Sequence, residues 1–377
     1  MELRSQEILV DTYGDIILRD PERAQRLEKS AALHYHLALK DLSVLLDNIN
    51  NSIGDIEDTD EIDAVFALWY LMLQFGLFDS DTIGWSHVHL EGIGSFLKPY
   101  LQSRIAAGKK ELPPASQQLL LFISYIDMNF SLCSYDGGRI WIELFLSESP
   151  DSPLSHDRLW TRARSCLPIL WGAEYPASEL FDDLDNHRPL YALHLCQRAK
   201  LEFLKWANDS TPGNDDERRR RGLWNRIQEM STDLTDVLAL ARIMPNSNGR
   251  RSMTTVFSAA MEFYTLQVLF ACLCPGDQVS ECLDSALSQI LSIAYKVIGE
   301  DQQLSFRSFW SLSVALLTSR DQIHQEWLRR QLKQASILCS AFSVFEPALN
   351  DSGVPTSLLL PSVAGMTNRT PCASEIV

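Results

Sequence analysis

The sequence has no apolar run long enough to cross a membrane and no apolar segment near its start. Uninterrupted apolar runs such as Leu119–Ile123 and Val268–Cys274 are far shorter than the roughly 18 residues that a membrane-spanning helix needs. The first residues, MELRSQEILVDTYGDI, are polar and acidic and lack the apolar core of a signal peptide. These absences predict an intracellular protein without a membrane span.

Positive charge is also scarce. The chain has 33 Lys and Arg against 49 Asp and Glu, a net charge of −16 and a pI near 4.9. Because phosphate neutralisation supplies most non-specific affinity for nucleic acids, we expect the chain as a whole to be repelled by DNA. The only dense basic run follows two aspartates and is predicted to be a solvated loop before a helix near Leu223, with a nuclear-localisation signal as a candidate function; it consists of Arg218, Arg219, Arg220 and Arg221.

Recognisable catalytic motifs are missing as well. The sequence contains no Gly-x-Ser-x-Gly, no P-loop and no His-Glu-x-x-His. No cysteine pair has zinc-finger spacing; the eight cysteines are scattered over positions 133, 166, 196, 272, 274, 282, 339 and 372. Without a secretion signal, we expect them to be reduced and mostly buried as small apolar side chains. A Cys–His catalytic pair stays open, because its members are distant in sequence.

Two histidines and a glutamate occur close together in GWSHVHLEGIGSFLKPYL, residues 84–101. His87 and His89 are separated by about 200° around a helix, so they do not face one metal ion. His89 and Glu91 match half of the zinc deaminase signature, but the Pro-Cys-x-x-Cys half is missing. Gly92 and Gly94 lack the third glycine of a dinucleotide-binding loop.

The same stretch instead predicts a packed helix. Gly92 and Gly94 are expected to let a neighbouring helix approach closely, since they have no side chains. The predicted packed face consists of Trp85, Val88, His89, Gly92, Ile93 and Phe96.

Acidic residues are concentrated before one strongly apolar segment. The acids are Asp55, Glu57, Asp58, Asp60, Glu61 and Asp63. Their order is not the Asp-x-Asp-x-Asp-Gly of a calcium loop. The sequence AVFALWYLMLQFGLF follows directly and predicts a central helix that is apolar almost all round. We expect the acids to lie at the N-terminus of that helix, where its dipole favours them.

Helical spacing of apolar residues continues along most of the chain. Asp20 and Pro21 form a start signal. The core-facing stripe after it consists of Ala31, Tyr35, Ala38, Leu42, Leu45 and Ile49. Further helices are predicted at about 85–107, 115–134, 138–147, 156–171, 178–184, 188–207, 222–242, 250–273, 279–299, 304–318 and 321–345.

These patterns predict an all-α fold. No short β-branched runs alternate with turn signals as strands do. The predicted organisation is an N-terminal segment at 1–19 and a helical domain at 20–346, built as a large irregular multi-helix bundle or an α-superhelix. Residues 347–377 are rich in Pro, Ser, Thr and Gly and predict a disordered tail.

Four segments carry a shared pattern in a fixed order. The first two are ALHYHLALKDLSVLL, with its tyrosine and Ala-Leu pair, and VFALWYLMLQFGLF. In the third, Trp85 precedes His89-Leu-Glu-Gly92-Ile and an apolar helix. In the fourth, SFWSLSVALLTSRDQIHQEWLRRQL at 308–332, an apolar helix with Trp310 precedes a polar turn, His324 and Trp327. Together they resemble the helical regulatory domain of fungal zinc-cluster transcription factors, over roughly residues 20–345.

The chain departs from that family in two ways. Ser311 follows Trp310, where the family usually has proline. Family members normally begin with six closely spaced cysteines that hold two zinc ions beside a basic segment, whereas the first cysteine here is Cys133. We therefore expect neither zinc nor direct DNA reading from this chain. Either the gene model lacks an N-terminal zinc-cluster module, or the chain is a regulatory domain that stands alone.

The resemblance implies a transcriptional regulator of a metabolic pathway, such as a secondary-metabolite pathway, in the nucleus or in cytoplasm and nucleus. It would act through self-association, coregulators or a small-molecule effector. The alternative is a modulator without DNA-binding activity that pairs with a full-length regulator. No enzyme, catalytic residue, cofactor, metal ligand or membrane contact is predicted. The positions that carry the pattern are expected to be structural: Trp85, His89, Gly92, Trp310, His324 and Trp327.

Overall fold

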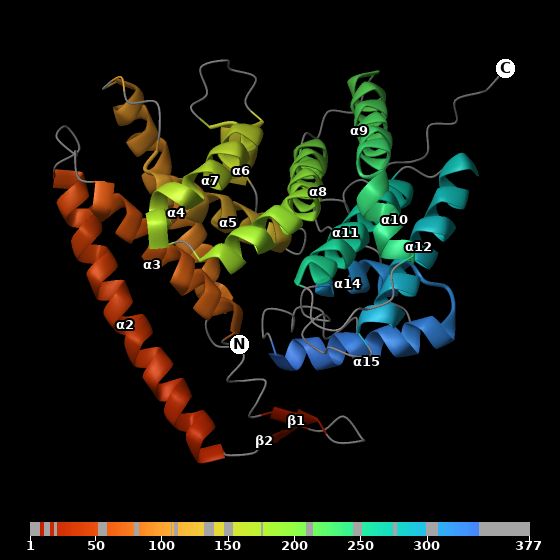
Figure 1. Ribbon diagram of the computed structural model, residues 1–377, viewed down its shortest axis with the longest axis horizontal. Coiled ribbons are helices and arrows are strands. Elements are labelled where there is room, and N and C mark those ends of the chain that lie inside the picture. Colours follow the sequence, from red (N-terminus) through yellow and green to blue (C-terminus); the bar gives the residue numbers. More distant parts are fainter. Residues whose placement is uncertain are drawn as a thin grey trace. The chain divides into compact units, whose positions relative to one another are not determined.

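A computed structural model describes the helices of the chain and one short hairpin before them (Figure 1). The described residues are 8–10, 16–18, 21–51, 59–78, 83–106, 108, 112–131, 139–146, 154–174, 176–208, 214–243, 251–273, 277–298 and 308–338. The predicted tail at 347–377 and the first three acids of the acidic segment, Asp55, Glu57 and Asp58, lie outside them.

The fold is all-α, as predicted. Apart from the hairpin, every described element is helical; the elements are α2 (Pro21–Asn51), α3 (Thr59–Phe78), α4 (Ile83–Ala106), α5 (Pro114–Ser131), α6 (Arg139–Phe145), α7 (His156–Trp171), the 3-10 helix η2 (Gly172–Glu174), α8 (Ala177–Asn208), α9 (Asn214–Asp233), α10 (Thr235–Ile243), α11 (Arg251–Leu273), α12 (Asp277–Val297), α14 (Phe309–Thr318) and α15 (Gln322–Leu338).

The hairpin corrects the prediction that the chain has no strands. Strands β1 (Ile8–Val10) and β2 (Ile16–Leu18) pair antiparallel, with Leu9 opposite Ile17. Each strand is a run of three apolar residues. So short a run shows no alternation of apolar and polar residues, which is the signal by which strands are recognised in a sequence.

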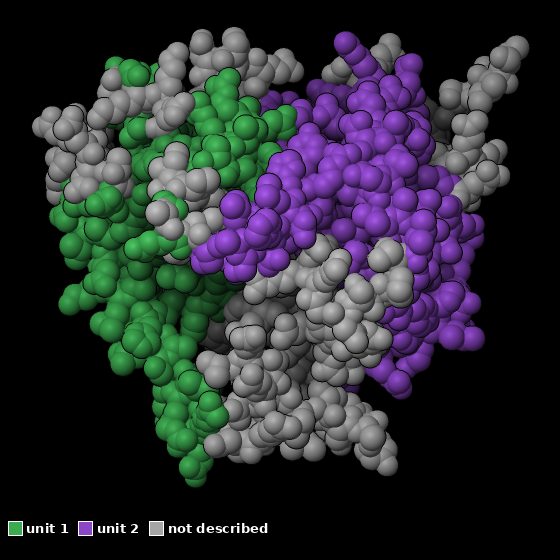
Figure 2. Space-filling view, viewed as in Figure 1, with its two compact units in different colours: residues 1–126, 147–174, 334–343 green, residues 127–146, 175–333, 344–377 purple. Residues whose placement is uncertain are grey.

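The chain divides into two compact units (Figure 2). Unit 1 contains residues 1–126, 147–174 and 334–343, and unit 2 contains residues 127–146, 175–333 and 344–377. The division falls within α5 and within α15. The predicted domain at 20–346 thus contributes segments to both units.

In unit 1, α3 packs against both α2 and α4. Its fully or nearly fully buried side chains are Ile62, Val65, Phe66, Trp69, Met72 and Leu73. The ring of Phe96, on α4, lies 5.4 Å from that of Trp69 and 5.4 Å from that of Tyr100. The apolar sequence of α3 therefore makes it the central helix of this unit, as its composition predicts.

The predicted stripe on α2 is only partly buried. Leu42 and Ile49 are buried, whereas the other members of the stripe are half-buried. Asp63, near the start of α3, accepts hydrogen bonds from the backbone N–H and the hydroxyl of Ser116, at 2.8 and 2.5 Å. This acid thus pairs with the start of α5, and Asp60 and Glu61 lie in the first turn of α3, where acids were expected.

In unit 2, α11 is the central helix and packs against α8, α10, α12 and α14. Its stretch Met253–Cys272 is long and apolar enough to cross a membrane by length and composition alone, yet 78% of it is buried inside the structure. The neighbouring helices bring their own apolar faces to α11. The apolar composition of α11 is therefore that of a core helix.

The division of the chain into helices differs from the predicted one at two places. Residues 178–184 and 188–207, predicted as separate helices, form the single helix α8, which continues through Pro189. Conversely, the predicted helix at 222–242 is divided at Leu234 into α9 and α10. The backbone hydrogen bonds from Leu234 to Met230 and from Leu238 to Leu234 are kept, at 2.9 Å each, so this division is a local irregularity.

Candidate functional site

In unit 1, a hydrogen bond joins the first and the third of the four segments that carry the shared pattern. The hydroxyl of Tyr35, on α2, lies 2.7 Å from Nε2 of His89, on α4. His89 is 6% exposed, and burial lowers the pKa of its imidazole, which favours the neutral form. With its proton on Nδ1, neutral His89 accepts this hydrogen bond. Tyr35 also stacks on Phe75 of α3 at 4.9 Å, so the contact links all three helices.

The prediction of a packed face on α4 is only partly correct for its other residues. Ile93 is buried, but Val88 is exposed and Gly92 is half-buried. A Cβ added at Gly92 meets no atom within 4 Å, so the expected close helix approach is wrong there. Trp85 lies in α4, and its side chain lies outside the described ones. The error for Val88 comes from helix geometry. Val88 lies 100° from His89 around the helix, so its side chain points away from the core when that of His89 points into it.

In unit 2, the most unusual feature is a buried charge. Lys200, on α8, is 0% exposed, and its ammonium nitrogen lies 2.5 Å from Oε2 of Glu262, on α11. The same nitrogen donates a 2.9 Å hydrogen bond to Oδ1 of Asn129, which also accepts from Gln197 at 3.3 Å. Burying an isolated charge is costly, so the stability of this buried ion pair depends on its hydrogen-bond partners.

Trp310, one of the family-pattern positions, completes this cluster. Its ring, on α14, lies 5.8 Å from the ammonium of Lys200, within the range of a cation–π interaction. We call Lys200, Glu262, Asn129 and Trp310 the buried cation cluster. Buried polar atoms in and beside the cluster lack hydrogen-bond partners among the described residues: Gln197 Oε1, Trp310 Nε1 and Ser311 Oγ, while Glu262 Oε2 makes only the ion pair.

The described cysteines are all free thiols, as expected. Burial raises the pKa of Cys196, and the carboxylate of Glu262 raises it further, while Lys200 acts in the opposite direction. Burial also raises the pKa of Cys272 to about 11 and that of Cys282 above its usual value. A nucleophilic cysteine needs a lowered pKa. The chemistry of these three thiols is therefore that of packed, protonated side chains.

In the fourth of these segments, at 308–332, side chains from the start of α15 pack against α12. The ring of Trp327 lies 4.1 Å from that of Tyr295, on α12, and the His324 ring lies 6.4 Å from the same tyrosine. The carboxylate of Asp321 accepts hydrogen bonds from the backbone N–H groups of Ile323, at 2.7 Å, and His324, at 3.3 Å. These bonds lower the pKa of Asp321. Asp321 thus caps the helix, and His324 sits in its first turn.

The basic run is helical, which corrects the predicted loop. Arg218, Arg219, Arg220 and Arg221 all lie in α9. Glu217 pairs with Arg220 and, at 3.5 Å, with Arg221. Helix formation is consistent with the (i, i+3) and (i, i+4) spacing of these opposite charges. Arg218 and Arg221 are exposed.

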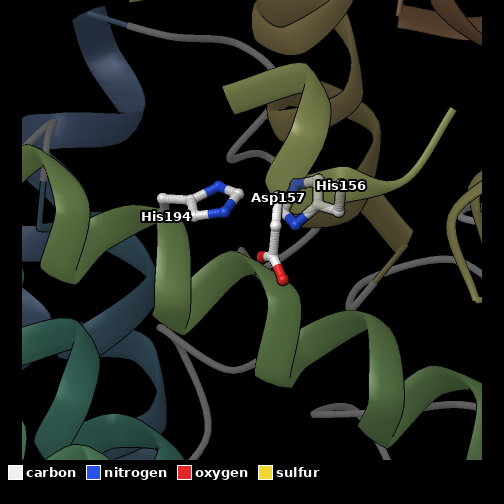
Figure 3. A group of neighbouring side chains, drawn as sticks. All are labelled: His156, Asp157 and His194. Atoms are coloured by element: carbon white, nitrogen blue, oxygen red, sulfur yellow. The ribbon is translucent and has the colours of Figure 1, made fainter. Parts of the chain in front are cut away.

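Figure 3 labels two histidines and an aspartate that belong to different units. His156 and Asp157 begin α7 in unit 1, and His194 lies on α8 in unit 2 (Figure 3). In unit 1, the buried ring of His156 packs edge-on against Tyr125 at 5.9 Å. Within each unit taken alone, the described residues hold no group of three histidine, cysteine or acidic side chains close enough for one metal ion.

Sequence reasoning missed most of the buried cation cluster. Asn129, Lys200 and Glu262 belong to helices far apart in the sequence, so no spacing rule connects them. One signal was present: Glu262 is the only charged residue between Met253 and Cys272. A lone acid on a core helix requires a buried partner.

Comparisons of the chain with models of protein families, with curated proteins and with solved structures find no match.

Proposed function

We propose that this chain is a transcriptional regulator of a metabolic pathway, such as a secondary-metabolite pathway. Its helical units would act by binding protein partners or an effector and not by reading DNA directly. The proposal rests on the resemblance to the regulatory domain of fungal zinc-cluster transcription factors, and the all-α fold is consistent with it.

One observation supports the proposal most directly. The resemblance marks Tyr35 in the first segment and His89 in the third, and these residues share a hydrogen bond of 2.7 Å. The two positions are separated by 54 residues, so neither chance local spacing nor a common helix accounts for the contact. Residues that mark separate segments of one pattern are expected to pack together if the pattern describes one fold.

A second candidate is a modulator that lacks DNA-binding activity and pairs with a full-length regulator. The net charge of −16 favours it. The basic run favours it too. Glu217 pairs with Arg220 and Arg221, so part of the positive charge that DNA binding needs is already neutralised within the helix. Both candidates bind proteins, and they differ in whether the chain acts alone.

A reporter assay tests the proposal and separates the candidates. The full chain is fused to a foreign DNA-binding module and expressed in a fungal host, with the module alone as control. A regulator changes reporter transcription by itself. A modulator changes it only when a full-length regulator is co-expressed. No change in either case contradicts the proposal.

The proposal includes a nuclear location. A fluorescent fusion of the full chain is expected to accumulate in the nucleus, with Arg218–Arg221 as the candidate import signal. Replacing the two exposed arginines, Arg218→Ala and Arg221→Ala, should shift the fusion to the cytoplasm. Arg226→Ala is the matched control, because Arg226 lies on the same helix and pairs with Glu202 at 2.9 Å.

A further inference from the structure

The first three turns of α8 present their side chains to solvent. From Ala177 to Arg188 no side chain is buried; Pro189 is the first that is. Three large apolar residues are exposed there: Leu180 at 44%, Phe181 at 66% and Leu184 at 63%. Exposed apolar groups that cluster in this way mark interaction sites more often than scattered ones do.

These apolar side chains share one face of the helix and are bordered by acids. At 100° per residue, Leu180, Leu184 and Phe181 fall within about 100° of arc. Asp183 flanks this arc on the Leu180 side, and Asp185 flanks it on the Phe181 side. Over 177–188, the acids Glu179, Asp182, Asp183 and Asp185 oppose the single Arg188, a formal charge of −3.

The base of this segment is fixed to the rest of unit 2. Arg188 donates hydrogen bonds to both carboxylate oxygens of Asp236, at 3.0 and 3.2 Å, and to the backbone carbonyl of Asp233. Those partners lie where α9 gives way to α10. The helix is thus held in place before any partner arrives, which reduces the ordering cost of binding.

We infer that residues 177–188, the docking helix, bind an apolar groove bordered by lysine and arginine on another protein. This inference rests on the proposed function and names the chemistry of the partner. Amphipathic helices bind such grooves through side chains spaced three and four residues apart, as Leu184 is from Phe181 and Leu180. The acids flanking them select a basic border by charge complementarity.

Charge disfavours the other common occupants of an apolar face. Anionic membrane surfaces attract basic helices, and the docking helix is acidic. A second copy of this chain carries a net charge of −16 and repels a segment of charge −3. A basic-bordered groove on a different protein satisfies both the apolar side chains and the carboxylates.

Site-specific crosslinking in the full chain tests the inference directly. Phe181 is replaced by the photoreactive p-benzoylphenylalanine, and the same replacement at Leu240 on α10 is the control. Leu240 is as exposed as Leu180, at 44%. The expected result is a crosslink from position 181, absent from position 240, to a peptide of another protein in which apolar residues adjoin lysine or arginine. It should weaken as salt is raised, because charge attraction is screened.

Two outcomes of this experiment overturn the inference. One is a crosslink to a peptide of this chain, from the same or a second copy. The other is labelling from position 181 that does not exceed labelling from position 240.

Substitutions in the reporter fusion measure the effect on function. Phe181→Ser with Leu184→Ser, and separately Asp183→Lys with Asp185→Lys, should each reduce the reporter response about tenfold or more, as loss of central anchors does. Leu240→Ser should leave it unchanged. Circular dichroism and melting temperature should match the unsubstituted chain, because these side chains are exposed or only half-buried.

The failures can be told apart. A reporter response that survives both double substitutions overturns the docking helix and leaves the proposed function standing. A full-chain fusion that never changes the reporter, alone or with a full-length regulator, overturns the proposed function. The crosslinking result then decides the docking helix independently.

Discussion

Lys200 and Glu262 form an ion pair of 2.5 Å in the interior of unit 2, with the lysine 0% exposed. The two residues join α8 to α11, the central helix of the unit. Removing one partner leaves a buried charge unpaired, whereas removing both leaves none. The stability of unit 2 therefore depends on the pair as a whole.

The first prediction concerns this pair. Lys200→Met or Glu262→Gln alone should lower the free energy of unfolding by about 3–5 kcal/mol. Lys200→Met combined with Glu262→Leu should be much closer to the unsubstituted chain, because no unpaired charge remains. Urea unfolding followed by circular dichroism measures both. As a control, Arg26→Met removes an exposed pair with Glu22 and should cost less than about 1 kcal/mol.

The second prediction concerns Trp310. Trp310→Phe keeps an aromatic ring beside the Lys200 ammonium and removes the unpartnered indole N–H. Trp310→Leu loses the ring and should be less stable than Trp310→Phe by up to about 2 kcal/mol, the size of a desolvated cation–π interaction. A double-mutant cycle with Lys200→Met checks the cause. If the difference between Phe and Leu persists in the Lys200→Met background, the ring acts through packing alone.

The third prediction is a pH dependence that originates at His89. Burial lowers the pKa of His89 in the folded chain below its unfolded value of about 6.5. The unfolded chain therefore binds the proton more readily, and stability falls as pH drops below about 6.5 through the lowered folded pKa. His89→Phe should make the stability profile between neutral and mildly acidic pH shallower.

Two further variants complete this test. Tyr35→Phe should cost about 1 kcal/mol at pH 8, since it removes the hydrogen bond to His89. His34→Gln, at an exposed position on α2, is the control and should leave the stability at pH 8 unchanged. Identical profiles for the His89→Phe variant and the unsubstituted chain would show that His89 titrates alike in both states.

The fourth prediction concerns thiol reactivity. With a pKa of about 11, Cys272 is only about one part in a thousand thiolate at pH 8, and Cys196 is fully buried with a pKa raised further. Iodoacetamide should leave both unlabelled in the folded chain and label them after unfolding. Peptide mass spectrometry gives the extent at each cysteine. Fast labelling of Cys196 in the folded chain would contradict its burial beside Lys200 and Glu262.

Much of the fold follows from the sequence because apolar spacing is a local property. The predicted helix at 156–171 has the observed bounds, and the one predicted at 250–273 corresponds to α11, Arg251–Leu273. Leu234 shows where this reasoning fails. Its apolar side chain continues the stripe from α9 into α10, so nothing in the spacing reveals the irregularity there.

Pro189 shows the opposite error. Proline removes one backbone donor and normally interrupts a helix, yet α8 continues through it. The carbonyl that loses its donor is that of Asp185, on the exposed segment, where water can replace the lost bond. Whether a proline ends a helix thus depends on solvent access, which only the fold determines.

The candidate sites were less accessible to prediction. Tyr35 and His89 were both marked as pattern positions, but their contact requires the packing of α2 on α4 through α3. The buried cation cluster draws on four helices, and Lys200, Glu262 and Asn129 are of residue types that usually lie at the surface. Sequence identifies such residues only through their unusual surroundings, as with Glu262 in α11.

The path of the chain through the two units limits how this protein can be shortened for experiments. Unit 1 takes residues from three separate stretches, and so does unit 2. No truncation at a single peptide bond yields either unit entire, and a bait or expression fragment that ends near residue 150 or 330 separates side chains that share a core. Loss of activity in such a fragment would report an incomplete core and not the position of a binding region, so shortened clones of this gene should be judged by their folding before their function.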